Sequence, residues 1–208
     1  MSDLPLILEW VQAHNFAVFT RGDYNVNLVA LRTPQEENPT PSGENRFNDR
    51  FFCVFKKGGQ WISRSWTCTS DPGLHFQRFP INPRGCGAIY APQQVRSGYR
   101  IGLHRGKSPA LVQSSTSRLR VYRDDDRSGV FDFDSATVEI GYGFNVHKGP
   151  LSPSGESAVD RASAGCIVFK KSKSFDTLLK VCEKSRQLYG NAFTLTFLNS
   201  PALGSRGR

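Results

Sequence analysis

The 208-residue sequence has no long hydrophobic run and only five cysteines. No stretch approaches the 18 or more consecutive apolar residues that a membrane-spanning helix needs, so we expect no membrane span. The N-terminal residues carry Asp3 and Glu9 and no basic start, which is not the pattern of a secretion signal. The cysteines form no CxxC pair and no zinc spacing, and their number is odd. We therefore expect synthesis in a cytoplasm, no disulfide framework and at least one free thiol.

Acidic residues are the minority charge, because 18 Asp and Glu face 27 Lys and Arg for a net charge of +9. This balance favours acidic partners: nucleic acid, an anionic membrane surface or an acidic polymer such as a bacterial cell wall. A helix-turn-helix, a zinc module and an aromatic RNA-binding motif are all missing, so we expect no specific nucleic-acid partner. A solvated basic surface is the simplest alternative interpretation.

Short apolar runs rich in Phe, Val and Ile, separated by many Gly and Pro, favour strands over helices. We expect strands over residues 25–32, 51–56, 61–69, 88–90, 99–103, 110–113, 119–123, 144–147, 167–169 and 192–198. A short opening helix ends near Asn15, and a second helix spans 174–189 between the cap Ser174 and the stop Gly190. The prediction is a mainly β (β-rich α+β) fold, a sandwich or barrel with one or two flanking helices. Residues 1–198 form one domain with a helical extension over 1–20, and 199–208 form a basic flexible tail.

The residues from Asn145 to Val168 carry the clearest chemical pattern. Cys166 follows a small-residue turn and precedes an apolar strand, a position that can expose a nucleophilic sulfur. The backbone N–H groups of Gly165 and Cys166 could point at an oxyanion. His147, at the end of the preceding predicted strand, can take the thiol proton and later return it to a leaving amine. The pattern predicts a cysteine acyl-transfer site.

The other four thiols are expected to be small buried hydrophobes. Cys53 and Cys68 lie inside predicted strands, Cys182 lies on the inner face of the predicted helix, and Cys86 lies in a Gly-rich loop without a nearby histidine.

The sequence resembles a known family at this point. A strand ending in His-Lys-Gly, a gap of fifteen residues (148–162) and then Ser-x-Gly-Cys is similar to the L,D-transpeptidase signature. Further segments are similar to a phage-type branch whose members are regarded as peptidoglycan-directed hydrolases. These segments are FND (47–49), TSDPG (69–73), HRGK (104–107), ALVQ (110–113) and VYRDDD (121–126), so the resemblance covers about residues 20–198.

The resemblance implies an L,D-transpeptidase-like catalytic fold and a role for each matching residue. Cys166 is the nucleophile and His147 the base, Gly165 supports the oxyanion, Ser163 braces the turn, and Asn145 orients the substrate or His147. Substrate-binding roles are assigned to His104, Lys107, Gln113 and Arg123. Two positions depart from the family pattern: Ala164 stands where the family has a second histidine, and Val168 stands where an arginine often follows the cysteine.

The implied activity is processing of peptidoglycan stem peptides through a cysteine acyl-enzyme. Cys166 attacks a carbonyl of an L-configured centre and expels a D-amino acid, and hydrolysis then gives a carboxypeptidase or endopeptidase, as in an endolysin. Without a signal peptide the protein is expected to be virion-associated or released to the cell wall, with other phage virion proteins as further partners. The alternative, favoured by Ala164, is a non-catalytic virion or wall-binding module with the same fold.

A second pattern concerns calcium, the one cofactor that the sequence suggests. Positions one, three, five, six and nine of a calcium loop are matched by Asp124, Asp126, Ser128, Gly129 and Asp132. Ser135 stands where the bidentate glutamate is expected, so an acidic turn between strands is the alternative interpretation.

Overall fold

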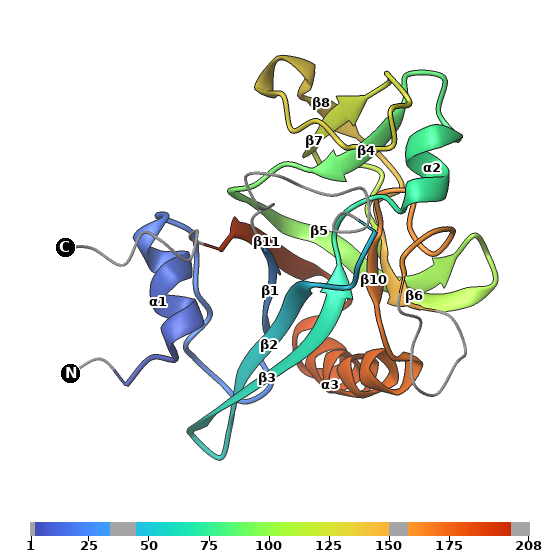
Figure 1. Ribbon diagram of the computed structural model, residues 1–208. Coiled ribbons are helices and arrows are strands. Elements are labelled where there is room, and N and C mark those ends of the chain that lie inside the picture. The colour runs from blue at the N-terminus through green and yellow to red at the C-terminus, as the bar shows by residue number, and fades with distance from the viewer. Residues whose placement is uncertain (1–2, 34–44, 150–157, 201–208) are drawn as a thin grey trace.

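A computed structural model of the protein describes residues 3–33, 45–149 and 158–200. Eight of its strands close into a barrel in the order β1-β11-β5-β6-β9-β10-β3-β2 (Figure 1). The bounds are β1 (Asn27–Arg32), β2 (Asp49–Lys57), β3 (Gln60–Thr69), β5 (Gln93–His104), β6 (Ser108–Gln113), β9 (Val146–Lys148), β10 (Ile167–Phe169) and β11 (Phe193–Asn199). Most neighbours run antiparallel, whereas β1 with β11 and β9 with β10 run parallel.

A smaller three-stranded sheet lies at one end of the barrel, at the top of Figure 1. It has the order β4-β7-β8, with β4 (Cys86–Ile89), β7 (Leu119–Asp124) and β8 (Glu139–Gly141). The short helix α2 (Leu74–Arg78) lies beside it, and a single 3₁₀ turn, η1 (Ser135–Thr137), precedes β8. The other helices, α1 (Leu6–Ala13) and α3 (Ser172–Tyr189), flank the barrel.

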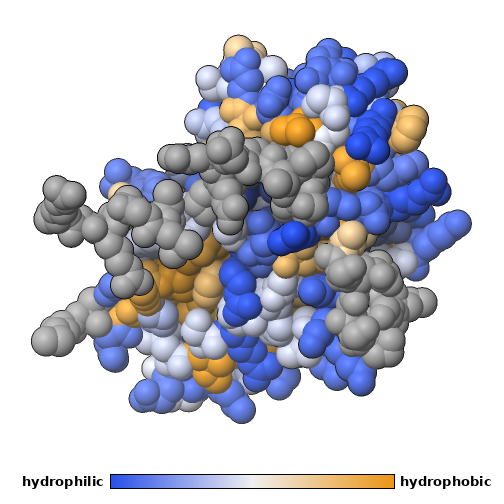
Figure 2. Space-filling view, viewed as in Figure 1, coloured by the Kyte–Doolittle hydropathy of each residue, from blue (hydrophilic) through white to orange (hydrophobic). Residues whose placement is uncertain are grey.

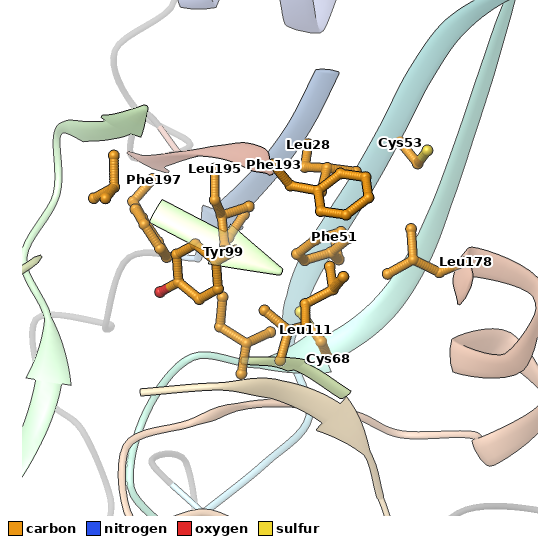
Figure 3. Packing of buried hydrophobic residues seen from close by; sticks show 14 of the residues in the cluster. Leu28, Phe51, Cys53, Cys68, Tyr99, Leu111, Leu178, Phe193, Leu195 and Phe197 are labelled. Carbon is orange, nitrogen blue, oxygen red and sulfur yellow. The ribbon is translucent and has the colours of Figure 1, made fainter. Parts of the chain in front are cut away.

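Side chains fill the barrel, as expected for an eight-stranded barrel. Phe51, Tyr99 and Leu111 from three different strands are fully buried in one cluster (Figure 3). On α3, apolar residues at helical spacing cover one opening of the barrel, and Leu178 points toward the cluster. Gly190 ends this helix at φ +88°, a conformation in which a residue without Cβ costs least.

The predicted mainly β fold is confirmed, and each predicted strand overlaps an observed one. The predicted helix cap is wrong: α3 begins at Ser172 after Lys171, which makes no side-chain capping bond. The predicted strand 144–147 begins two residues later, at Val146, and neither α2 nor β8 was predicted. Of the predicted tail, Asn199 belongs to β11, and residues 201–208 lie outside the described part of the chain.

The N-terminal helix α1 is packed against the barrel rather than standing off it. Leu8 and Val11 are buried in a second cluster with Val29 and Val54. Figure 2 shows a mostly hydrophilic face with hydrophobic residues gathered beside α1, where Leu6 and other apolar side chains line a shallow groove. None of the helices in the described ranges is long and apolar enough to cross a membrane.

Candidate functional site

Two short parallel strands bring Cys166 beside Asn145, two residues before His147. The register pairs Ile167 with Val146, so Cys166 and Asn145 immediately precede paired residues. The Ile167 N–H donates to the Asn145 carbonyl at 2.9 Å, and the Asn145 N–H donates to the Cys166 Sγ at 3.4 Å. Residues more than twenty positions apart in sequence therefore meet at the start of β9 and β10.

Strand alternation places this site on the outer side of the barrel wall. Val146 and Ile167 belong to the barrel core, whereas Val168 and Cys166 pack in a separate cluster. Because successive side chains of a strand point to opposite faces, His147 shares the outer face with Cys166. His147 is held between two neighbours, opposite Ala110 of β6 and Val168 of β10.

The turn before β10 is stabilised by hydrogen bonds within the turn. The Ser163 Oγ accepts the Gly165 N–H at 3.0 Å and donates to the Cys166 carbonyl at 2.8 Å. Gly165 has φ +121°, and a Cβ there would lie 2.2 Å from the carbonyl oxygen of Gly87. Ser163 therefore links both ends of the turn through its hydroxyl. The Gly165 N–H is occupied by Ser163 and is unavailable to an oxyanion in this arrangement.

The ring orientation of His147 is set by a backbone carbonyl. Its Nδ1 lies 2.9 Å from the Lys148 carbonyl oxygen, which can only accept, so Nδ1 carries the hydrogen. Nε2 therefore keeps its lone pair. Burial lowers the pKa of His147 to about 4, partly opposed by the bond to Lys148 and reinforced by the charges of His104 and Arg105. The imidazole is neutral at pH 7 and can accept a proton.

His104, at the end of β5, has the opposite tautomer. The Asn145 Oδ1 accepts the Gln113 N–H at 2.9 Å, which identifies the other amide atom as Nδ2, a donor. That Nδ2 lies 2.9 Å from the His104 Nδ1, which must accept, so the hydrogen of a neutral His104 is on Nε2. Burial and the charge of Arg105 lower the pKa of His104. Asn145 thus orients His104 rather than His147.

The imidazoles of His104 and His147 and the thiol of Cys166 lie close together. The rings of His104 and His147 are stacked with centroids 4.3 Å apart, and one ligand atom of each histidine and the Cys166 Sγ all lie within 4.8 Å of one another. Burial raises the pKa of the half-buried Cys166, while the Asn145 N–H and the charge of Arg105 lower it. The resting pair is therefore a neutral thiol and a neutral imidazole, and sulfur must lose its proton as it attacks.

The same three side chains are the ones that could hold a metal ion. They are the one group of three or more His, Cys, Asp or Glu ligands that the described residues bring together. Thiolate and imidazole ligands suit Zn²⁺. The Nε2–H tautomer of His104 offers a hydrogen rather than a lone pair, however, so proton transfer fits this arrangement better than ion binding.

A cleft of about 580 Å³ opens over the thiol. Its lining includes Phe76, Ile81, His104, Arg105, Arg123 and Tyr142. Ile81 and Tyr142 are exposed, so the cleft has an apolar rim. Within the described ranges no aspartate or glutamate lines it.

The four predicted substrate-binding residues differ in whether they line the cleft and in what their side chains contact. His104 and Arg123 line the cleft, but Arg123 forms a 2.7 Å ion pair with Glu139. Gln113 uses its side-chain amide on the backbone, donating to Gly141 at 2.8 Å and accepting from Phe144 at 3.0 Å. Lys107 is exposed in the β5–β6 turn and is not among the lining residues.

The residues that match the calcium loop form a turn in which side chains hydrogen-bond to the backbone of the same turn. Asp124 accepts the N–H groups of Asp126 and Asp132, and Asp126 accepts the N–H of Ser128 at 2.7 Å. Ser128 in turn bonds to the backbone of Val130. The carboxylates thus satisfy the loop backbone, and a calcium ion here stays a prediction.

The sequence analysis did not identify two groups that act on the histidines and the thiol of this site: the carbonyl of Lys148 and the guanidinium of Arg105. Lys148 contributes through its backbone, for which the residue type gives no signal. Arg105 was inside the HRGK segment and was passed over in favour of its neighbours. The prediction for the other four cysteines is confirmed, since all are buried.

No family model, curated protein or solved structure matches this chain.

Proposed function

We propose that the protein is a cysteine-dependent, L,D-transpeptidase-like enzyme that hydrolyses stem peptides of peptidoglycan. One observation carries the proposal: the Lys148 carbonyl holds His147 in the tautomer with a free Nε2 lone pair, and a ring nitrogen of His147 lies within 4.8 Å of the Cys166 Sγ. A cysteine that serves only as a small buried hydrophobic residue needs no oriented histidine beside it. Orientation of a base by a third group is the arrangement of nucleophilic catalysis.

The reaction has two halves. As the Cys166 sulfur attacks the scissile carbonyl carbon, its proton passes to the His147 Nε2 and the carbonyl oxygen becomes an oxyanion. The Cys166 N–H, which has no acceptor within the described residues, and the His104 Nε2–H are the candidate donors to that oxyanion. The C–N bond then breaks, His147 returns the proton to the leaving amine, and a thioester remains on Cys166.

Water completes the second half. His147 takes a proton from the water as its oxygen attacks the thioester carbonyl. The C–S bond breaks, the acid product leaves, and the proton returns to the thiol. An acceptor amine in place of water would give transpeptidation by the same steps.

The substrate class comes from the sequence resemblance and the charge. The His-Lys-Gly and Ser-x-Gly-Cys segments are the two blocks that resemble the L,D-transpeptidase signature, and they supply the base and the nucleophile here. The net charge of +9 favours an acidic wall polymer. The family's second histidine is replaced by Ala164, but His104 places an imidazole at the same cleft from β5.

Mass spectrometry of purified muropeptides tests the proposal. Tetrapeptide stems and cross-linked dimers are incubated with wild-type protein, Cys166→Ala and His147→Gln. The matched controls are Cys182→Ala, which removes a buried thiol on α3, and His14→Gln, which removes an exposed imidazole directly after α1. We expect a hydrolysis product from wild type and both controls and none from Cys166→Ala. Full activity of Cys166→Ala would refute the mechanism.

The second candidate is a non-catalytic virion or wall-binding module, which Ala164 favours. It predicts that folded wild-type protein gives no product from any stem, while wild type and Cys166→Ala sediment equally with purified cell walls.

A further inference from the structure

Arg105 is the cation of the cleft that no described acidic residue neutralises. It follows His104 in the turn between β5 and β6 and lines the cleft together with Cys166. The other lining arginine, Arg123, is bound by Glu139, which also binds Arg84. No ion pair and no hydrogen bond links the Arg105 side chain to another described residue.

The charge of Arg105 acts on the reactive group itself. It lowers the pKa values of His104, His147 and Cys166, so its field reaches all three side chains. With no described carboxylate in the lining, the cleft has an excess positive charge beside the nucleophile. An anionic group on a bound substrate would be attracted to this point.

We infer that Arg105 binds a carboxylate of the substrate next to the scissile bond. A planar guanidinium matches a carboxylate in two parallel hydrogen bonds, and this pairing gives orientation as well as affinity. The inference rests on the proposed function for its substrate: a stem peptide offers a carboxylate on its terminal residue and others within the retained part. Binding of the terminal carboxylate would make the enzyme a carboxypeptidase.

The first experiment needs no peptidoglycan. Cys166 is alkylated at pH 9 with anionic iodoacetate and, separately, with neutral iodoacetamide, and both adducts are quantified by peptide mass spectrometry. The ratio of the two rates cancels the ionisation of the thiol and reports the local charge. The variant is Arg105→Asn, because Asn tolerates the left-handed backbone of Arg105, at φ +51°.

Arg127→Asn is the matched control, since Arg127 is an exposed arginine at φ +59° that is not among the cleft-lining residues. We expect the iodoacetate-to-iodoacetamide ratio to fall about tenfold in Arg105→Asn, the scale of one charge-assisted interaction, and to stay at the wild-type value in Arg127→Asn. An unchanged ratio in Arg105→Asn would overturn the inference.

The second experiment finds the source of the carboxylate. The substrates are a tetrapeptide stem with a free C-terminus and the same stem as its C-terminal amide. A wild-type preference of about tenfold or more for the free acid over the amide, lost in Arg105→Asn, assigns the terminal carboxylate. Equal rates on the two stems, both lowered in Arg105→Asn, assign a carboxylate in the retained part. Equal rates unaffected by Arg105→Asn contradict the inference.

The two experiments separate the inference from the proposed function. A fallen alkylation ratio with no product from either stem would refute stem-peptide hydrolysis while leaving the anion site in place. Product formation with an unchanged alkylation ratio would support stem-peptide hydrolysis and refute the anion site at Arg105.

Discussion

The Nδ1 of His147 donates a hydrogen bond to the carbonyl of Lys148, the next residue in the chain, at 2.9 Å. This contact holds the half-buried His147 in the Nδ1–H tautomer and so leaves free the Nε2 lone pair that the proposed mechanism requires of the base. His104, stacked on His147, has its hydrogen on the other nitrogen because Asn145 donates to its Nδ1. The two adjacent imidazoles thus have opposite tautomers: His147 has a free Nε2 lone pair, and His104 has an Nε2–H.

The opposite tautomers can be observed directly. Long-range ¹H–¹⁵N spectra of the four histidines at pH 7 should show His147 as the Nδ1–H form and His104 as the Nε2–H form. In Asn145→Ala, His104 loses the donor to its Nδ1 and should become a mixture, while His147 keeps its pattern. Matching tautomers for the two rings in the wild-type protein would contradict the proposed division of roles.

The acid limb of activity should lie well below the usual range for histidine. Because burial lowers the pKa of His147 to about 4, its base form is complete at mildly acidic pH. We expect kcat/KM for a stem peptide to rise with pH through about 4 and to be level from about pH 5.5 to 8. An inflection near pH 6.5 would mean that His147 is not buried as described or is not the base.

The same shift predicts an effect on stability, measured as the free energy of unfolding by urea. Below pH 6.5 the unfolded state protonates His147 while the folded state does so only near pH 4, so stability is lost as pH falls between these values. His147→Gln should show less of this loss. Burial raises the pKa of Asp49 to about 7, which acts in the opposite sense, but both proteins share it, so their difference isolates His147.

Gly165 should be intolerant of any side chain. Gly165→Ala places a Cβ 2.2 Å from the Gly87 carbonyl oxygen and also imposes a left-handed conformation, so we expect the Cys166 turn to shift and activity to fall at least about a hundredfold. Gly190→Ala is the control, because it shares the positive φ but meets no atom within 4 Å. It should lose about 1 kcal/mol of stability and keep full activity.

The strands could be predicted because short runs rich in Phe, Val and Ile between Gly and Pro favour strands over helices. Barrel closure could not, since it depends on the long-range pairing of β1 with β11 and β2. The cap of α3 was misplaced because Ser172 and Ser174 are both plausible at a helix start, whereas the observed N-cap is Lys171, which makes no side-chain capping bond. The strand β8, with three residues, is too short to show an alternating pattern.

At the site, the pairing of a small-residue turn with a preceding histidine could be predicted from local sequence. The contributions of His104 and Arg105 depend on β6 pairing with β5 on one side and β9 on the other, an arrangement that no local pattern shows. The role of Gln113 was misjudged for the same reason: its amide bonds to the backbone of a segment about thirty residues away.

The most direct test of the central claim is the intact mass of the protein shortly after mixing with a tetrapeptide stem. We predict a covalent adduct equal to the stem without its leaving residue, mapped by digestion to the peptide that contains Cys166 and released by hydroxylamine, as a thioester is. His147→Gln should form it much more slowly, and Cys166→Ala not at all. Product formation without any adduct on Cys166, or by Cys166→Ala itself, would contradict the account.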